Sequence, residues 1–138
     1  MIVVDTNVIA ALMLPASTKT EAAMNLLRVD REWAAPVLWR SEFTNILATG
    51  TRNGWFGLEQ ALEALSSAEE VMDAGEFRVP AREVLRVANL SGCSGYDAEY
   101  VVLAQDLSVP LVTLDEQLLK AFPRTAVSLD TFGPEVAA

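Results

Sequence analysis

The chain contains no histidine and only one cysteine, Cys93, among its 138 residues. The absence of histidine excludes His-ligated zinc, Ser-His-Asp triads and histidine general bases. A single cysteine forms no internal disulfide, which suits a reducing compartment, so we expect a cytoplasmic protein. No stretch reaches the roughly 18 apolar residues of a membrane-spanning helix, and the apolar N-terminus lacks the basic segment of a secretory signal. We therefore expect no membrane association.

Basic residues are also scarce, since 10 Lys and Arg stand against 19 Asp and Glu and the formal net charge is −9. A protein that binds nucleic acid normally carries a basic face. The acidic excess therefore has two interpretations: an ordinary soluble surface, or carboxylates that gather to bind cations. An acidic surface also favours a basic protein partner.

Short apolar runs alternate with helix-length amphipathic segments, and the length and 51% apolar content fit one domain over residues 1–138. The predicted strands cover residues 2–4, 32–35, 77–79, 110–114 and 126–129, the last at a sheet edge. The predicted helices cover residues 11–14, 21–27, 36–52 (opened by Pro36), 58–72, 80–90, 97–107 and a short segment ending at Phe122. This alternation predicts an α/β fold with a mostly parallel sheet.

Two of these strands, residues 2–4 and 111–114, are almost wholly apolar, as strands buried on both faces are. Each leads directly into an aspartate, Asp5 and Asp115. Ligands of open parallel sheets bind beyond the carboxyl ends of the strands, where the strand order reverses. If the two strands are neighbours, the aspartates should lie about 5 Å apart, where they repel each other unless a cation intervenes. Alternatively, each aspartate only caps the helix that follows.

Two more acidic residues are expected near the same place. Asp97 follows the Gly/Ser-rich loop 91–95 and opens a predicted helix, so it is also a candidate N-cap. Glu42 lies toward the edge of the apolar arc of its helix when residues are placed 100° apart. An inward carboxylate is costly unless it is paired or binds metal. A basic partner or an ordinary exposed position are the alternatives for Glu42.

Several carboxylates without histidine or cysteine form a hard-oxygen site, which suits Mg²⁺ or Mn²⁺ rather than zinc or copper. Such metals lower the pKa of bound water and neutralise charge on a phosphate, so no side-chain nucleophile is required. The candidate metal ligands and catalytic residues are Asp5, Glu42, Asp97 and Asp115.

Four segments together resemble the PIN-domain ribonucleases, and the length resembles the VapC-type toxins of bacterial toxin–antitoxin pairs. The segments are residues 4–8 (VDTNV), 36–42 (PVLWRSE), 96–104 (YDAEYVVLA) and 110–115 (PLVTLD). Each motif is weak alone, whereas the four in this order and spacing are specific and span nearly the whole chain.

The resemblance implies a three-layer α/β/α sandwich and an endoribonuclease that hydrolyses RNA with Mg²⁺ or Mn²⁺ and acts as a toxin. It implies that Asp5 and Asp97 are the principal metal ligands and that Asp115 completes the site. Glu42 would bind metal or orient the attacking water.

The resemblance also implies supporting residues and partners. Thr6, Asn7 and Thr113 match positions that hydrogen-bond the acids, although turn or strand-end roles are an equal alternative. The implied partners are an RNA substrate, a second copy of the chain and a cognate antitoxin, which places a segment in an apolar groove and a basic side chain toward the acids. Candidate groove or dimer residues, mostly also core candidates, are Leu12, Met13, Leu14, Leu26, Leu27, Trp39, Phe43, Trp55 and Phe56. Candidate RNA contacts are Arg28, Arg31, Arg40, Arg52, Arg82 and Arg86.

The sequence argues against three other functions. A phospho-acceptor receiver domain has a double acid after its first strand and a lysine after its last, whereas the only lysines here are Lys19 and Lys120. Phosphatases of the haloacid-dehalogenase type require D-x-D, and Asn7 stands at the third position. The remaining alternative is an inactive PIN-like interaction module, against which the complete set of four acids argues.

Overall fold

A computed structural model describes residues 1–15 and 17–132. In this part of the chain the strands are β1 (Ile2–Val4), β2 (Trp33–Pro36), β3 (Glu76–Phe77), β4 (Leu111–Thr113) and β5 (Ala126–Ser128). The helices are α1 (Thr6–Met13), α2 (Thr20–Val29), α3 (Trp39–Arg52), α4 (Leu58–Val71), α5 (Ala81–Ser91), α6 (Gly95–Leu107) and α7 (Glu116–Ala121). The strands form one parallel sheet in the order β3-β2-β1-β4-β5.

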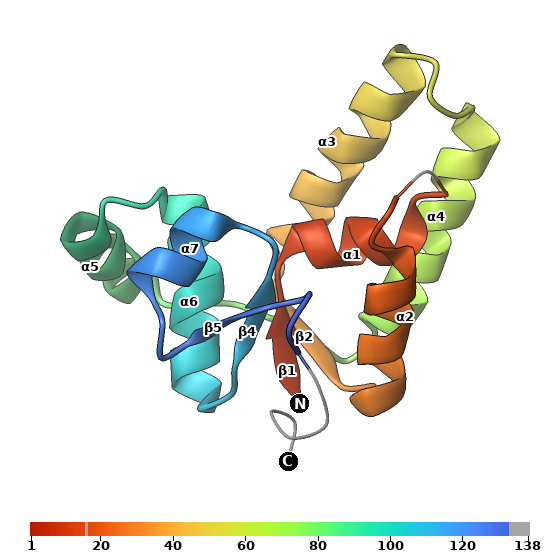
Figure 1. The fold of residues 1–138 in the computed structure, drawn as a ribbon. Coiled ribbons are helices and arrows are strands. Elements are labelled where there is room, and N and C mark those ends of the chain that lie inside the picture. The colour runs from red at the N-terminus through yellow and green to blue at the C-terminus, as the bar shows by residue number, and fades with distance from the viewer. Residues whose placement is uncertain (16, 133–138) are drawn as a thin grey trace.

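Helices cover both faces of this sheet (Figure 1). Helix α1 packs on one face and contacts α2, α3 and α4. Helix α6 packs against β1, β2 and β4 on the other face, and α5 packs against α6. Helices α3 and α4 form a hairpin that extends away from the sheet (Figure 1). The predicted three-layer α/β/α sandwich with a parallel sheet is confirmed.

The central layer is apolar because β1 and β4 are buried along their whole length. Helix α6 is likewise buried over residues 100–104, since it lies between the sheet and α5. A helix that is apolar on most sides is stable only when it is covered in this way. Although α6 is largely apolar, it has only 13 residues. No helix in the described ranges is both long and apolar enough to cross a membrane.

Two predicted boundaries were wrong in ways that affect the site. Helix α1 begins at Thr6 and not at residue 11, so it starts directly after β1 with Asp5 as its N-cap. Pro36 ends β2 and does not open α3, which begins at Trp39. The backbone amides of Ala35 and Val37 donate to the carbonyl oxygens of Gly75 and Phe77 in or beside β3, at 2.8 and 3.0 Å, so the chain around Pro36 is held as a strand.

Gly75 allows β3 to approach β2. A Cβ atom at this position would lie 2.0 Å from the carbonyl oxygen of Trp33. A backbone oxygen in a paired strand has little freedom to move, so only glycine fits here.

Candidate active site

The strand order reverses between β1 and β4, because β2 and β3 extend the sheet on one side and β5 on the other. Ligands of open α/β sheets bind at this switch point, beyond the carboxyl ends of the strands. Asp5 follows β1 and Asp115 lies two residues beyond β4. The two strands are neighbours, which was the condition for placing their aspartates close together.

The register of the two strands corrects one expectation. Val4 pairs with Val112, and the Asp5 amide donates to the Val112 carbonyl oxygen at 3.0 Å. Thr113, and not Asp115, is therefore the residue beside Asp5. The spacing of about 5 Å expected from direct strand pairing does not apply to the two aspartates.

Asp5 is buried, with 7% of its surface exposed, and both of its carboxylate oxygens accept hydrogen bonds. The Thr6 amide donates to Oδ1 at 2.7 Å, and the Thr113 hydroxyl donates to Oδ2 at 2.8 Å. Burial raises the pKa of Asp5 to about 6; these two bonds oppose the rise, and the charges of Glu42 and Asp97 add to it. The site therefore holds a carboxylate that gains from a nearby cation.

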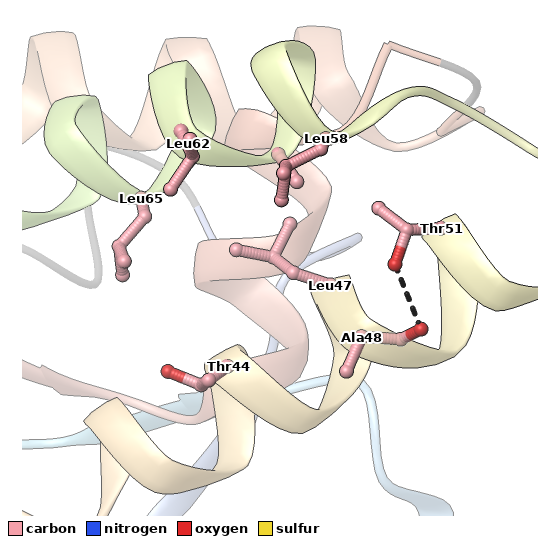
Figure 2. A pocket seen from close by; sticks show the side chains of 8 residues that line it. Thr44, Leu47, Ala48, Thr51, Leu58, Leu62 and Leu65 are labelled. Atoms are coloured by element: carbon pink, nitrogen blue, oxygen red, sulfur yellow. Dashed lines mark hydrogen bonds between the residues drawn. The ribbon is translucent and has the colours of Figure 1, made fainter.

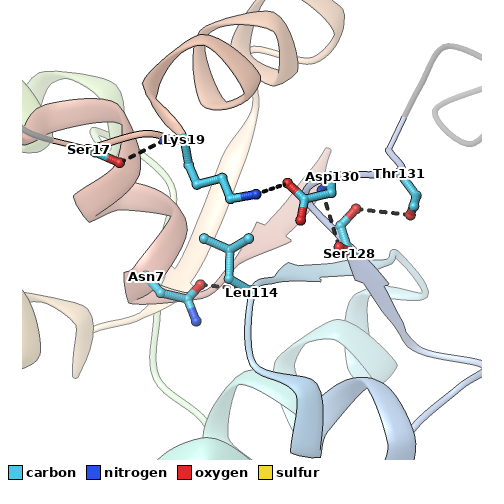
Figure 3. Close-up of polar contacts among 7 residues, drawn as sticks. All are labelled: Asn7, Ser17, Lys19, Leu114, Ser128, Asp130 and Thr131. Atoms are coloured by element: carbon cyan, nitrogen blue, oxygen red, sulfur yellow. Dashed lines mark hydrogen bonds and ion pairs between the residues drawn. The ribbon is translucent and has the colours of Figure 1, made fainter.

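Asn7 and Thr113 tie the start of α1 to the segment after β4. The Asn7 amide nitrogen lies 3.4 Å from both Asp5 Oδ2 and the Thr113 hydroxyl. Its oxygen accepts from the Leu114 amide at 3.2 Å (Figure 3), and the Thr113 hydroxyl accepts from the Asp115 amide at 3.0 Å. These bonds fix where the chain leaves β4 toward Asp115.

A second polar link lies beside this one. The Lys19 ammonium is 2.7 Å from a carboxylate oxygen of Asp130, so the residue before α2 is joined to the turn after β5 (Figure 3). Both side chains are largely exposed, and such pairs contribute roughly 0–1 kcal/mol. The ion pair therefore stabilises the contact between these two segments only modestly.

Glu42 lies in the first turn of α3 and is half-buried. Its Oε1 accepts from the Thr6 hydroxyl at 2.9 Å and from the Tyr100 hydroxyl at 2.6 Å. Thr6 and Tyr100 also contact each other through their hydroxyls. Sequence analysis assigned no role to Tyr100, although a tyrosine in an apolar helical run needs a partner for its hydroxyl and so gave a signal.

Asp97 is placed differently from its prediction. Helix α6 begins at Gly95, and its N-cap is Ser94, whose hydroxyl accepts from the Asp97 amide at 3.0 Å. Asp97 therefore sits in the first turn and is not the cap. Partial burial raises the pKa of its carboxyl, and the charges of Asp115 and then Glu42 raise it further, against a hydrogen bond from Ser94.

Asp115 is the N-cap of α7, as its alternative interpretation had it. Its Oδ1 accepts from the amides of Gln117 and Leu118 at 2.8 and 3.3 Å. Capping leaves Oδ2 without a protein hydrogen bond among the described residues. Cap and site are therefore compatible roles for one carboxylate.

The charges of Glu42 and Asp97 raise the pKa of Asp5, and those of Asp115 and Glu42 raise the pKa of Asp97, so each of the four acids lies near enough to another to affect its ionisation or be affected by it. No lysine or arginine forms an ion pair with any of them in the described ranges. Within those ranges, however, no three acidic or cysteine side chains are close enough together to enclose a cation directly. An all-oxygen, unneutralised set of this kind fits Mg²⁺ or Mn²⁺, because such ions keep several waters and use one or two carboxylates.

Arg40, a candidate RNA contact, is occupied within the protein. Its guanidinium donates to Glu76 and Glu69 at 2.6 and 2.7 Å, and lies 5.3 Å from the centre of the Trp39 ring. These bonds join α3 to β3 and α4. Arg40 is therefore a structural residue in this state of the protein.

The candidate groove residues are divided between core and surface. Leu26, Trp39 and Phe43 are in the core, whereas Trp55 is 68% exposed. Phe56 is half-buried, and its ring covers Gly50.

An apolar groove of about 220 Å³ lies between α3 and α4 (Figure 2). Leu47 points from α3 toward Leu58 and Leu62 of α4. Its lining residues are Thr44, Leu47, Ala48, Thr51, Leu58, Ala61, Leu62 and Leu65, and none of the nine candidate groove or dimer residues is among them.

The fold and the acids at its switch point define a class of protein. The model of the PIN domain family matches residues 2–125, and the chain belongs to this family. It is similar to Ribonuclease VapC3 of Pyrobaculum aerophilum, with 30% identity over 125 residues that cover 88% of this chain and 95% of the relative. It also resembles the crystal structure of PAE2754 from Pyrobaculum aerophilum, with a TM-score of 0.75, 27% identity and coverage of 94% of this chain and 83% of that one. The predicted resemblance to PIN-domain ribonucleases of the VapC type is confirmed.

Proposed function

We propose that this protein is an endoribonuclease that hydrolyses RNA with Mg²⁺ or Mn²⁺ and acts as the toxin of a toxin–antitoxin pair. The observation that carries the proposal is the buried carboxylate of Asp5 at the β1–β4 switch point, held by Thr113 of β4, near the charges of Glu42 and Asp97 and without a basic ion-pair partner in the described residues. The similarity to a curated ribonuclease along most of the chain supports it.

In this proposal Asp5 and Asp97 are the principal ligands, and Asp115 completes the site through the oxygen that does not cap α7. A bound cation would neutralise charge on the scissile phosphate and make a nearby water more acidic. Glu42, held at Oε1 by two hydroxyls, would accept a hydrogen bond from the attacking water or contact the cation through water. Thr6, Asn7 and Thr113 would keep the acids in place.

We further propose a cognate antitoxin as protein partner, with an apolar segment seated between α3 and α4. The exposed Leu58 and Leu62 of that groove favour apolar side chains, and the net charge of −9 favours basic residues beside them. We also propose that the chain forms one domain, that it assembles as a homodimer and that it is located in the cytoplasm.

The dimer is tested by size-exclusion chromatography with light scattering. A monomer at micromolar concentration would contradict it.

The activity is tested with purified protein freed of antitoxin and a mixed RNA pool in Mn²⁺. Wild type should cleave, and Asp5→Asn and Asp97→Asn should not. Asp106→Asn is the matched control, because this exposed aspartate lies on the same helix as Asp97. Cleavage that persists in the two site variants would refute the mechanism. A folded wild type that binds an antitoxin but cleaves no RNA would favour the inactive interaction module.

A further inference from the structure

We propose that Tyr100 is a positioning residue for Glu42, and that together with Thr6 it holds Oε1 so that Oε2 is the oxygen presented for the reaction. This inference rests on the proposed function of the site. Its evidence is a cluster of side chains from three helices: Thr6 opens α1, Glu42 lies in the first turn of α3, and Tyr100 lies in α6.

The contacts are unequal on the two carboxylate oxygens of Glu42. Oε1 accepts from the hydroxyls of both Thr6 and Tyr100, and Oε2 accepts no hydrogen bond among the described residues. A glutamate side chain has much rotamer freedom, and ordering it costs conformational entropy. Two donors from different helices therefore fix one oxygen and, through the plane of the carboxylate, the direction of the other.

Proton counting makes the carboxylate the centre of this cluster. Three oxygens lie within contact of one another, but the two hydroxyls of Thr6 and Tyr100 provide only two hydrogens. Either hydroxyl can also donate to the other, so two hydrogens serve three contacts, and the carboxylate is an acceptor in every arrangement. The cluster therefore depends on the carboxylate of Glu42 as its acceptor.

Burial makes Tyr100 suited to this work. Its side chain is fully buried, so its hydroxyl cannot exchange Glu42 for bulk water. Its ring is fixed among its neighbours in the core. Residues that hydrogen-bond to the side chains around a metal orient those side chains, and their mutation typically lowers metal affinity or activity roughly 10–100-fold.

A purely structural tyrosine would predict a different result from a positioning residue. If Tyr100 only fills the core, Tyr100→Phe keeps the ring and leaves catalysis unchanged. If it acts through Glu42, the same change lowers activity in wild type but has no further effect once Glu42→Gln has been introduced. Double-mutant cycles separate these cases.

The experiment measures kcat and KM on a defined RNA and, separately, the affinity for Mn²⁺ by calorimetry. The variants are Tyr100→Phe, Thr6→Val, Thr6→Ser and Glu42→Gln, with Tyr96→Phe as the matched control, an exposed tyrosine in the first turn of α6. Tyr100→Phe should lower kcat or Mn²⁺ affinity roughly 10-fold, with KM for RNA changed less than about twofold. Thr6→Ser should retain more activity than Thr6→Val, because serine keeps the hydroxyl.

Three results would overturn the inference. One is wild-type kcat and Mn²⁺ affinity in Tyr100→Phe while Glu42→Gln is impaired. The second is an equal loss from Tyr100→Phe with and without Glu42→Gln. The third is a wild type that neither binds Mn²⁺ nor cleaves RNA. A wild type that binds Mn²⁺ without cleaving RNA refutes the ribonuclease instead, and the calorimetric cycle then still decides the role of Tyr100.

Discussion

The buried carboxyl of Asp5 should make the metal-free protein less stable as the pH rises. Burial raises the pKa of Asp5 from 3.8 to about 6. Between these two values the folded state holds a proton that the unfolded chain releases, so the free energy of unfolding falls with increasing pH. The loss is complete above the folded pKa. Asp5→Asn, which is neutral throughout, should not show this loss.

The magnitude follows from the size of the shift. A rise of about 2 pKa units corresponds to about 3 kcal/mol. About 2 kcal/mol of this loss in the free energy of unfolding should appear between about pH 4 and about pH 7. The rest appears below about pH 4, where Asp5 of the unfolded chain begins to ionise. This is a large share of the roughly 5–15 kcal/mol by which proteins of this size are stable.

The assay is urea unfolding of wild type and Asp5→Asn in a chelator, at several pH values in that range. The quantity of interest is the difference between the two free energies of unfolding, since the other acids titrate in both proteins and largely cancel. Wild type should lose about 2 kcal/mol relative to the variant from about pH 4 to about pH 7, and Mn²⁺ should remove most of the loss. If the difference between the two free energies of unfolding stays constant with pH, the pKa of Asp5 is not raised by its burial in the folded protein.

Three further predictions concern the metal, an ion pair and a glycine. Mn²⁺ at about 100 times its dissociation constant should stabilise wild type by about 2.7 kcal/mol, and a urea titration should find most of this gain absent in Asp97→Asn. Arg40→Lys should cost about 1 kcal/mol, because lysine cannot form the forked bonds to Glu76; a loss that high salt does not reduce would contradict an ionic origin. Gly75→Ala should cost more than about 2 kcal/mol, because its Cβ meets a strand carbonyl, whereas Gly95→Ala, with open space around its Cβ, should change thermal stability little.

The strands and the acids at their ends could be predicted because their signal is local. An apolar run that ends in aspartate is visible in the sequence at Asp5 and at Asp115, and parallel sheets place such ends at one edge. The register between the strands was not predictable, because it depends on pairing across more than 100 residues. The register is what sets Thr113 beside Asp5.

Helix starts show the same division between local and distant causes. Leu58–Val71 was predicted within one residue, since Gly57 precedes it and its pattern is continuous. Pro36 was assigned to a helix because proline suits a first turn. In the structure Pro36 pairs with Phe77 of β3, which lies about 40 residues away in the sequence. The residues near Pro36 therefore do not indicate this pairing.

The position of the groove between α3 and α4 could not be read from the sequence. Hydrophobicity made Trp39 and Phe43 candidate groove or dimer residues, and both are buried in the core, which was the alternative given for most of these candidates. The groove forms where α3 and α4 pack against each other in the hairpin that extends away from the sheet (Figure 1). Its position follows from the geometry of the hairpin, and composition alone does not contain that information.

Helix capping and metal binding, which the sequence left as alternatives for Asp5 and Asp115, are compatible roles. Both residues cap a helix, and both are ligands in the site that we propose. Capping orients the carboxylate before any cation binds, and for Asp115 it occupies only one oxygen. Asparagine caps helices about as well as aspartate, so Asp→Asn keeps much of the cap and removes the charge, whereas Asp→Ala removes both. Activity lost equally in Asp115→Asn and Asp115→Ala would therefore assign the effect to charge, and activity lost only in the alanine variant would assign it to the start of α7.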